Sequence, residues 1–309
     1  MTDLRVGVVG AGNMGGRVAR RLRDAGVSIV AFDRSAEQLA ASGIPAAASV
    51  AELVGSVDVV LLSLPDSPVV ERVVLGDDGI AAHARAGQVV VDLSTASPQS
   101  TVALHATLQE AGVELLDAGI SGGAKAAEQG TLTLMVGGSA DALATVTPVL
   151  DHFSAKVFHM GPPGAGHVAK VLNNYLNGVN LAATAEAMLA ARMSGLDLEQ
   201  FLDVLNNSSG VNFATLNRFP SIVKGDYLEG GLTGRLMAKD LRLCLDHLAR
   251  IGSPTFIGPA TLAAFEVANA GGYGEVISNH VVDGLGDLAG GVRLQADPTT
   301  TTTTTGSQA

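Results

Sequence analysis

The chain has 309 residues, 47% hydrophobic and 16% charged, which is enough apolar material for more than one hydrophobic core. Its formal net charge is −11, so it lacks the basic surface expected of a nucleic-acid-binding protein. Cys244 is the only cysteine, which excludes an internal disulfide and a thiolate metal cluster, and we expect no metal.

The N-terminus leads directly into a strand pattern, without the charged flank, apolar stretch and cleavage site of a signal peptide. No run of eighteen apolar residues follows anywhere in the sequence. We therefore expect a protein that works in the cytoplasm and has no membrane partner.

Residues 4–9 form a short, Val-rich run that predicts a strand, and a helical pattern covers residues 18–25. The turn between them is Gly10-Ala11-Gly12-Asn13-Met14-Gly15. Glycines permit a tight turn and close approach of a pyrophosphate, while a helix N-terminus offers unpaired N–H groups and a partial positive charge. A glycine pattern alone is weak, but this strand, turn and helix context predicts a dinucleotide-binding unit with all six residues at the cofactor.

The second predicted strand, residues 28–32, ends in Asp33-Arg34. An acid about 20 residues after the glycines is where this fold holds the ribose hydroxyls of NAD. Asp33 repels a 2′-phosphate and Arg34 attracts one, unless Arg34 is only a solvated surface charge. The pair favours NAD and leaves NADP open.

Serines at 35 and 49 have capping-box spacing and predict two short helices. Strands are expected at 57–64 and 89–93, and Ser97 is expected to cap a helix that begins at Pro98. Ligands bind at the carboxyl ends of strands in a doubly wound sheet, so the loops after these strands are candidate cofactor contacts. The candidates are Leu64, Pro65 and Thr95, although turn chemistry alone also explains Pro65.

A further strand at 113–117 leads to Ser121-Gly122-Gly123. Successive N–H groups of such a turn, with the serine hydroxyl, form a concave anion site that suits a carboxylate; a flexible turn is the alternative. Strands at 131–136 and 156–160 complete a mostly parallel sheet.

The stretch 161–177 places one cation and three amides within an apolar helical pattern. Gly and Pro are frequent up to Gly166 and rare after it, so a long helix is expected to begin there and to run to Ser194. Its polar side chains share one face: Lys170, Asn173, Asn174 and Asn177. A lysine that extends from the helix surface into solvent is the ordinary alternative.

Only helical patterns follow, at 198–206, 213–219, 236–251, 259–270 and 276–288. We therefore predict an N-terminal Rossmann-type doubly wound α/β sheet (1–161) and an all-α C-terminal domain (162–296), joined by the long interdomain helix. Residues 297–309 are a Thr-rich, low-complexity tail that we expect to be disordered. The alanine-rich long helix favours a homodimer or homotetramer.

Five blocks, in this order, resemble the beta-hydroxyacid dehydrogenase family, which includes 3-hydroxyisobutyrate dehydrogenases and tartronate semialdehyde reductases. They are Gly-Ala-Gly-Asn-Met-Gly at 10–15, Asp-Leu-Ser-Thr-Ala-Ser-Pro at 92–98, Ser-Gly-Gly with Gly-Thr-Leu-Thr-Leu-Met-Val-Gly-Gly within 121–138, Gly-x-Gly-x-x-x-Lys-x-x-Asn-Asn at 164–174 and Lys-Asp-Leu at 239–241. The resemblance covers residues 4–290 and implies NAD(P)-dependent interconversion of a small beta-hydroxy acid and its semialdehyde or keto acid by hydride transfer.

The resemblance implies Lys170 as the general acid/base at the substrate oxygen. Asn174 is implied to hydrogen-bond the substrate, with Asn173 nearby. A free lysine titrates near 10.4; burial and a neighbouring nicotinamide cation lower the pKa of such an amine toward the range a base needs at neutral pH.

The same resemblance implies that Ser121, Gly122 and Gly123 hold the substrate carboxylate. It implies that Thr95 and Lys239 flank the nicotinamide end of the cofactor, with Asp240 as support for Lys239.

The chain departs from the family pattern in the substrate loop. Family members often carry Asp-Ala-Pro-Val-Ser-Gly-Gly, whereas residues 117–123 are Asp-Ala-Gly-Ile-Ser-Gly-Gly, and Ala126 replaces a frequent glycine. Gly119 in place of proline is similar to the 6-phosphogluconate dehydrogenases, which are usually much longer. The departure leaves the identity of the substrate open, but not the reaction type.

Two alternatives remain from the sequence. Imine reductases of the same fold usually replace the lysine with Asp or Tyr, and a non-catalytic NAD(P)-binding scaffold or sensor needs no such residue. The chain retains Lys170, Asn174, Ser121 and Lys239 together, which favours the dehydrogenase.

Overall fold

The computed structural model describes residues 4–295, so the predicted tail 297–309 lies outside the described residues. The chain divides into two compact units. The first contains the described residues up to Asn174 together with Leu243–Pro254. The second contains Tyr175–Arg242 and the described residues from Thr255 onward.

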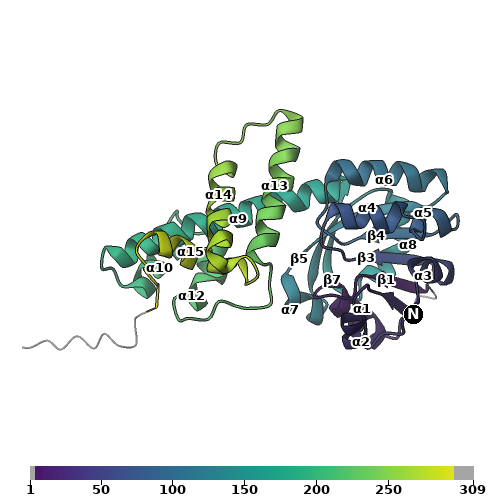
Figure 1. Cartoon of the computed structure of the whole chain (residues 1–309), viewed down its shortest axis with the longest axis horizontal. Coiled ribbons are helices and arrows are strands. Elements are labelled where there is room, and N and C mark those ends of the chain that lie inside the picture. Colours follow the sequence, from purple (N-terminus) through teal and green to yellow (C-terminus); the bar gives the residue numbers. More distant parts are fainter. Residues whose placement is uncertain (1–3, 296–309) are drawn as a thin grey trace, which may run out of the picture. The chain divides into compact units, whose positions relative to one another are not determined.

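A seven-stranded sheet forms the centre of the first unit (Figure 1). Its strands are β1 (Val6–Val9), β2 (Ile29–Phe32), β3 (Val59–Leu62), β4 (Val89–Asp92), β5 (Glu114–Ser121), β6 (Leu132–Gly137) and β7 (Ser154–Gly161). Their order is β2-β1-β3-β4-β5-β6-β7, and all neighbours are parallel except β5 and β6. The mostly parallel sheet predicted from the sequence is confirmed.

Eight helices accompany this sheet among the described residues. They are α1 (Gly15–Asp24), α2 (Ala36–Ser42), α3 (Val50–Ser56), α4 (Ser67–Leu75), α5 (Ile80–His83), α6 (Pro98–Glu110), α7 (Gly123–Gln129) and α8 (Ala140–Leu150). Ser35 and Ser49 cap α2 and α3 as predicted, because their hydroxyls accept the N–H groups of Gln38 and Glu52.

The sheet is buried on both faces, as alternate residues of its strands show. On β3, Val59 and Leu61 pack with α1, α7 and α8 in one hydrophobic core. Val60 and Leu62 pack with α3, α4, α5 and α6 in another. Figure 1 shows α4, α5 and α6 together on one side of the sheet and α1 and α2 on the other. The doubly wound α/β architecture is therefore confirmed.

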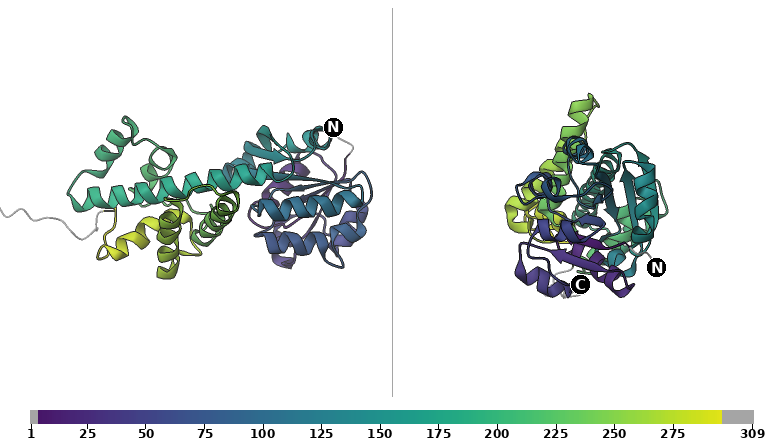
Figure 2. Two further views of the ribbon diagram at one scale, coloured as in Figure 1. Left: turned by 90° about the horizontal axis from the view of Figure 1, so that it is seen from above. Right: turned by 90° about the vertical axis from the view of Figure 1, so that its right-hand side faces the viewer.

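The long predicted helix is α9 (Ala165–Met193), a continuous helix of 29 residues that begins in the first unit and continues into the second (Figure 2). The remaining elements are α10 (Leu198–Asn206), α11 (Phe213–Asn217), α12 (Phe219–Ile222), α13 (Gly234–Ile251), α14 (Gly258–Ala268), the π-helix η1 (Asn269–Tyr273), the 3-10 helix η2 (Ser278–His280) and α15 (Val281–Leu288). The second unit has its own core, to which Met188, Phe219 and Phe265 contribute fully buried side chains. Its predicted all-α character is confirmed within the described residues.

Local details differ from the sequence prediction at three places. The helix expected over 213–219 is divided into α11 and α12 at Arg218, next to Pro220, whose ring removes a helical N–H. The helix expected over 276–288 consists of η2 followed by α15. Ser97 stands at the N-cap of α6, but its hydroxyl donates to Gln99 Oε1 at 3.0 Å instead of accepting a backbone N–H.

Candidate active site

The glycine-rich turn between β1 and α1 fits a dinucleotide. Gly10 has φ +97°, and a Cβ there would overlap the carbonyl oxygen of Ser63, so only glycine permits this approach to β3. At Gly12, by contrast, an added Cβ would meet only the flexible end of Gln38, at 3.0 Å. The N-terminus of α1 has neither a side-chain cap nor an acidic residue in its first turn. This backbone can therefore receive an anionic pyrophosphate without competition from a carboxylate.

Asp33 lies immediately after β2 and orders this turn. Its Oδ2 accepts the N–H of Ala11 at 2.7 Å, and its Oδ1 accepts the N–H of Ser35 at 2.8 Å. Each carboxylate oxygen still has a further lone pair, so ribose hydroxyls can also donate to Asp33. The Arg34 side chain, next along the chain, is exposed.

The loops that follow β3 and β4 are tied to each other at the same edge of the sheet. The N–H of Leu64 donates to Ser94 Oγ at 2.9 Å, and the N–H of Ser97 donates to Ser67 Oγ at 2.8 Å. β1, β3 and β4 are parallel and in register, so their carboxyl ends meet along one edge. Pro65 and Thr95 therefore lie at the edge that also carries the glycine-rich turn.

Lys170 lies in the second turn of α9, with 9% of its surface exposed. Its Nζ donates to Asn174 Oδ1 at 2.9 Å, and Asn174 is also buried. The predicted pairing of a lysine and an asparagine one helical turn apart is therefore formed. A solvated surface lysine, the alternative left open by the sequence, does not fit this burial.

Gly119 of β5 provides the space that Lys170 occupies. A Cβ at position 119 would overlap the Cβ of Lys170 and lie 2.9 Å from its Cγ. This contact explains why a glycine stands where the family pattern often has proline: the stem of the lysine crosses the strand there. Ser121, the first residue of the Ser-Gly-Gly loop, is only two residues away on the same face of β5.

The Ser-Gly-Gly loop is not the flexible turn that was the alternative reading. Ser121 ends β5, Gly122 has φ +126° and α7 begins at Gly123, whose φ is +70°. Both glycines adopt backbone conformations that other residues rarely take. The loop is thus a defined connection at the end of β5, with Gly122 and Gly123 exposed.

Asp117 is a site residue that the sequence analysis did not select. It is fully buried on β5, and its Oδ1 and Oδ2 accept the N–H groups of Gly164 and His167 at 2.8 and 2.7 Å. Burial raises the pKa of this carboxyl, while the charge of His167 and these N–H groups act in the opposite direction. A carboxylate within the apolar run Leu115-Leu116-Asp117-Ala118 was the available signal.

His167, which the sequence suggested as a packing residue, is fully buried beside Asp117. Its Nδ1 lies 2.7 Å from Thr101 Oγ1, and that hydroxyl donates its hydrogen to the carbonyl of Ser97 at 3.1 Å. The hydroxyl therefore accepts from His167, which places a proton on Nδ1. The other ring nitrogen, Nε2, lies 4.0 Å from Asp92 Oδ2.

Three other polar residues from the sequence analysis have defined partners. Asn173 is exposed and donates to Asn174 Oδ1 at 3.3 Å. In the second unit, Asn177 Oδ1 accepts from Arg218, and Lys239 Nζ lies 2.9 Å from Asp240 Oδ1. The predicted support of Lys239 by Asp240 is thus present.

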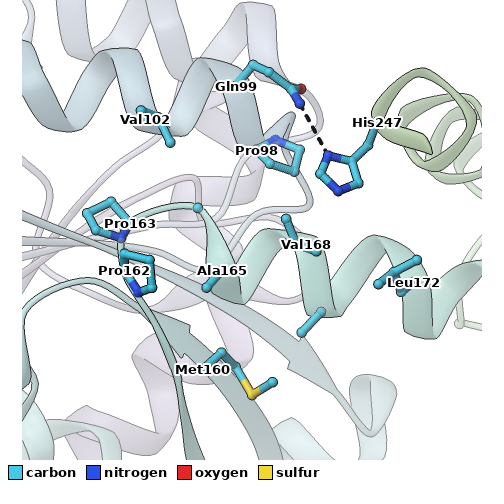
Figure 3. Close-up of a pocket in the computed structure, with 12 residues that line it drawn as sticks. Pro98, Gln99, Val102, Met160, Pro162, Pro163, Ala165, Val168, Leu172 and His247 are labelled. Atoms are coloured by element: carbon cyan, nitrogen blue, oxygen red, sulfur yellow. Dashed lines mark hydrogen bonds between the residues drawn. The ribbon is translucent and has the colours of Figure 1, made fainter. Parts of the chain in front are cut away.

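A groove of about 660 Å³ lies on another side of α9 (Figure 3). Its lining from α9 consists of Ala165, Val168, Ala169 and Leu172, and its one polar pair is Gln99 with His247, 3.2 Å apart. At 100° per residue, these α9 positions face away from Lys170. The groove is apolar and is distinct from the residues assembled around Lys170.

Comparison with known proteins identifies the relatives of this arrangement. Residues 5–161 match the NAD binding domain of 6-phosphogluconate dehydrogenase, and residues 164–282 match the NAD-binding domain of NADP-dependent 3-hydroxyisobutyrate dehydrogenase. An NAD-dependent L-serine dehydrogenase of Pseudomonas aeruginosa is 38% identical over 281 residues, which cover 88% of this chain and 94% of the relative. The chain belongs to the beta-hydroxyacid dehydrogenase family.

Other beta-hydroxyacid dehydrogenases agree with this assignment. The 3-hydroxyisobutyrate dehydrogenase of Pseudomonas aeruginosa is 36% identical over 267 residues, covering 84% of this chain and 89% of that protein. The structure of Mycobacterium tuberculosis 3-hydroxyisobutyrate dehydrogenase with L-serine has a TM-score of 0.83 and 32% identity, covering 92% and 99% of the two chains. An imine reductase from a Pseudomonas species, at 21% identity and a TM-score of 0.62, shares the fold.

Family membership confirms the predicted reaction class. The chain is an NAD(P)-dependent oxidoreductase that acts on a CH–OH group, with a Rossmann-type domain for the cofactor. None of the helices between residues 4 and 295 combines the length and the apolar character that a membrane crossing requires.

Proposed function

We propose that this chain interconverts a small beta-hydroxy acid and its semialdehyde or keto acid, with Lys170 as the general acid/base. The observation that carries the proposal is the contact between Lys170 and Gly119, because it brings the buried amine beside the strand that ends in Ser121. A group that exchanges a proton and a loop suited to a carboxylate thus lie together. This is the spacing that a 3-hydroxy acid needs, since its hydroxyl and carboxylate are two carbons apart.

In oxidation, the neutral Lys170 amine accepts the hydroxyl proton of the substrate, and in reduction its ammonium form returns a proton to the carbonyl oxygen. The bound nicotinamide accepts or supplies the hydride at the same carbon. Asn174, held by Lys170 at 2.9 Å, orients the substrate oxygen, with Asn173 beside it. The N–H groups and hydroxyl of Ser121, Gly122 and Gly123 hold the carboxylate.

Replacement of Lys170 tests this proposal directly. Lys170→Met keeps the aliphatic stem against Gly119 and removes only the amine, whereas Lys170→Ala removes both. We expect either change to lower kcat by about 100- to 10,000-fold, the usual contribution of a general acid/base, with the Kd of NADH nearly unchanged. Lys156→Ala, which removes an exposed lysine of β7, is the matched control. Undiminished turnover in Lys170→Met contradicts the assignment.

The substrate follows from a panel of hydroxy acids. Relatives are named for L-serine, 3-hydroxyisobutyrate, L-threonate and 2-(hydroxymethyl)glutarate. These acids, with glycerate, 3-hydroxypropionate, 4-hydroxybutyrate and sulfonated analogues, should be compared by kcat/KM. All four relatives' acids share a carboxylate, so loss of turnover when the carboxylate is converted to an amide is the expected common result.

The proposed cofactor contacts are the glycine-rich turn, the ends of β2, β3 and β4, and Lys239. They are Gly10, Ala11, Gly12, Asn13, Met14, Gly15, Asp33, Arg34, Leu64, Pro65, Thr95 and Lys239. We propose NAD as the preferred cofactor, because Asp33 is fixed by two backbone N–H groups whereas Arg34 is exposed. The ratio of kcat/KM for NAD and NADP, in the native chain and in Arg34→Ala, tests this choice. A preference of the native chain for NADP that Arg34→Ala abolishes contradicts it.

We further propose domains at 1–161 and 162–296 and a cytoplasmic homodimer or homotetramer. An exposed apolar surface in the first unit supports self-association: Phe158 and Met160 on the edge strand β7 and Leu172 on α9 are all exposed. Light scattering after size-exclusion chromatography gives the mass in solution. A monomer at micromolar concentration contradicts the oligomer without affecting the proposed chemistry.

A further inference from the structure

We propose that Asp117 is a positioning residue for Lys170. Its buried carboxylate fixes the first turn of α9 on β5 and so determines where the lysine amine meets the substrate. The proposal rests on the role of Lys170 proposed above. It adds a residue that touches neither substrate nor cofactor and acts only through the helix that carries the lysine.

Asp117 performs the capping that the sequence around the helix start cannot provide. Gly164 is the N-cap residue of α9, since its carbonyl accepts the N–H of Val168 at 2.9 Å. The segment Gly161-Pro-Pro-Gly164-Ala-Gly166 has no polar side chain, so it lacks the Ser, Thr, Asp or Asn that usually satisfies the first N–H groups. Asp117, 47 residues before Gly164, accepts that N–H with one oxygen and the N–H of His167 with the other.

Two glycines place the helix start directly on the strands. A Cβ on Gly166 would overlap the carbonyl oxygens of Asp117 and Met135. A Cβ on Gly137 of β6 would lie 2.6 Å from Asp117 Oδ1 and 2.8 Å from the nitrogen of Gly166. No side chain therefore separates the helix from the sheet, and the carboxylate is the polar link across this contact.

The capped turn and the lysine belong to the same face of α9. Gly166 and Lys170 are four residues apart, and Gly166 contacts β5 at Asp117 while Lys170 contacts it at Gly119. A rotation of roughly 10° about the helix axis moves an atom about 6 Å from that axis by about 1 Å. A displacement of about 1 Å at a reacting group is enough to lower turnover about 100-fold.

His167 gives the capped turn a second anchor. Its backbone N–H donates to Asp117, and its ring donates to Thr101 of α6. Asp92 of β4, opposite Asp117 in the parallel register, faces the other ring nitrogen at 4.0 Å. Loss of one carboxylate oxygen at Asp117 therefore releases the backbone of a turn whose side chain stays attached elsewhere, which favours rotation of the turn over its unfolding.

The test compares two capping aspartates. Asp117→Asn keeps one acceptor and turns the other oxygen into an NH₂ group that faces a backbone N–H, while Asp117→Ser leaves a single acceptor. Asp197→Asn is the control, because Asp197 caps α10 through the N–H of Gln200 at 2.8 Å and that helix carries no proposed site residue. For each full-length chain we would measure kcat, KM, the Kd of NADH, the pH profile of kcat, and the pH dependence of Lys170 acetylation by acetic anhydride, read by mass spectrometry.

We expect Asp117→Asn to lower kcat about 30- to 100-fold, with the Kd of NADH within about twofold of the native value. The pH profile of kcat and the acetylation profile of Lys170 should both shift, and Asp197→Asn should match the native chain in every measurement. A folded Asp117→Asn with native kcat and native profiles overturns the proposal, even if its melting temperature is lower, because a purely stabilising residue gives that result. If Asp117→Asn does not fold, Asp117→Ser is judged by the same criteria.

Acetylation separates this proposal from the proposed function, because it needs no substrate. If the native chain oxidises no hydroxy acid, the proposed function fails, and an acetylation profile of Lys170 that shifts in Asp117→Asn still supports the positioning role. If the native chain is active and the variant's profiles are unchanged, only the positioning role fails.

Discussion

Replacement of Gly119 by alanine adds one methyl group at the point where β5 meets Lys170. The new carbon would overlap the Cβ of Lys170 and lie 2.9 Å from its Cγ, whereas non-bonded carbons prefer 3.5–4.0 Å. The lysine stem or the strand must therefore move by about 1 Å. A shift of that size at the proton-transfer group predicts a fall in kcat of about 100-fold, or about 2.7 kcal/mol of transition-state stabilisation. Overpacking of this contact should also reduce the free energy of unfolding by about 1–3 kcal/mol.

Steady-state NADH formation and thermal denaturation measure the two effects of Gly119→Ala separately. The Kd of NADH should stay near the native value, since the glycine-rich turn lies at the end of β1. Gly55→Ala is the matched control: Gly55 is exposed on α3, and a Cβ there meets no atom within 4 Å. That control should keep native kcat and gain about 0.5–1 kcal/mol of stability. Native kcat together with a native melting temperature in Gly119→Ala would refute the close contact and the reasoning built on it.

Three further predictions concern the cofactor turn, the buried acid and the single thiol. Gly12→Ala should fold normally, because the added carbon meets only the end of Gln38, but should raise the Kd of NAD at least about tenfold in a fluorescence titration, since the methyl stands where the pyrophosphate approaches; an unchanged Kd is the contrary result. Burial raises the pKa of Asp117 in the folded chain above the unfolded value of about 3.9, so its contribution to the free energy of unfolding is greatest below that pH and declines as the pH rises through the folded pKa. Urea denaturation over a pH series should show this decline in the native chain and not in Asp117→Asn, and identical pH slopes would count against it. Burial raises the pKa of Cys244 to about 11, so a thiol reagent at pH 8 should react only after denaturant is added, and rapid reaction of the folded chain is the opposing outcome.

Much of the fold could be predicted because local sequence determines it. Strand patterns between turn residues and a glycine-rich turn before a helix are local signals, and they located all seven strands of the sheet. The start of α9 was equally readable, since Gly and Pro up to Gly166 exclude a helix that the following residues favour. Such signals do not extend to element boundaries: the helix expected over 213–219 is interrupted at Arg218.

Individual site residues were predictable where their chemistry is unusual for their position. Lys170 and Asn174 were conspicuous as polar residues in an apolar helix, and their hydrogen bond follows from the helix period alone. Asp33 was predictable from its place after β2, but its two bonds to the backbone of the cofactor turn were not, because Ala11 is 22 residues away.

The sequence by itself therefore determined the order of elements, the cofactor turn and the lysine on the long helix, because each depends on residues close together in the chain. Only the tertiary structure decided why position 119 is glycine and why position 117 is aspartate. Both depend on a contact with α9 some 50 residues later, at Lys170 and at Gly164 and His167. Whether a side chain has room, and whether a buried N–H has an acceptor, are questions about neighbours in space, which no local pattern contains.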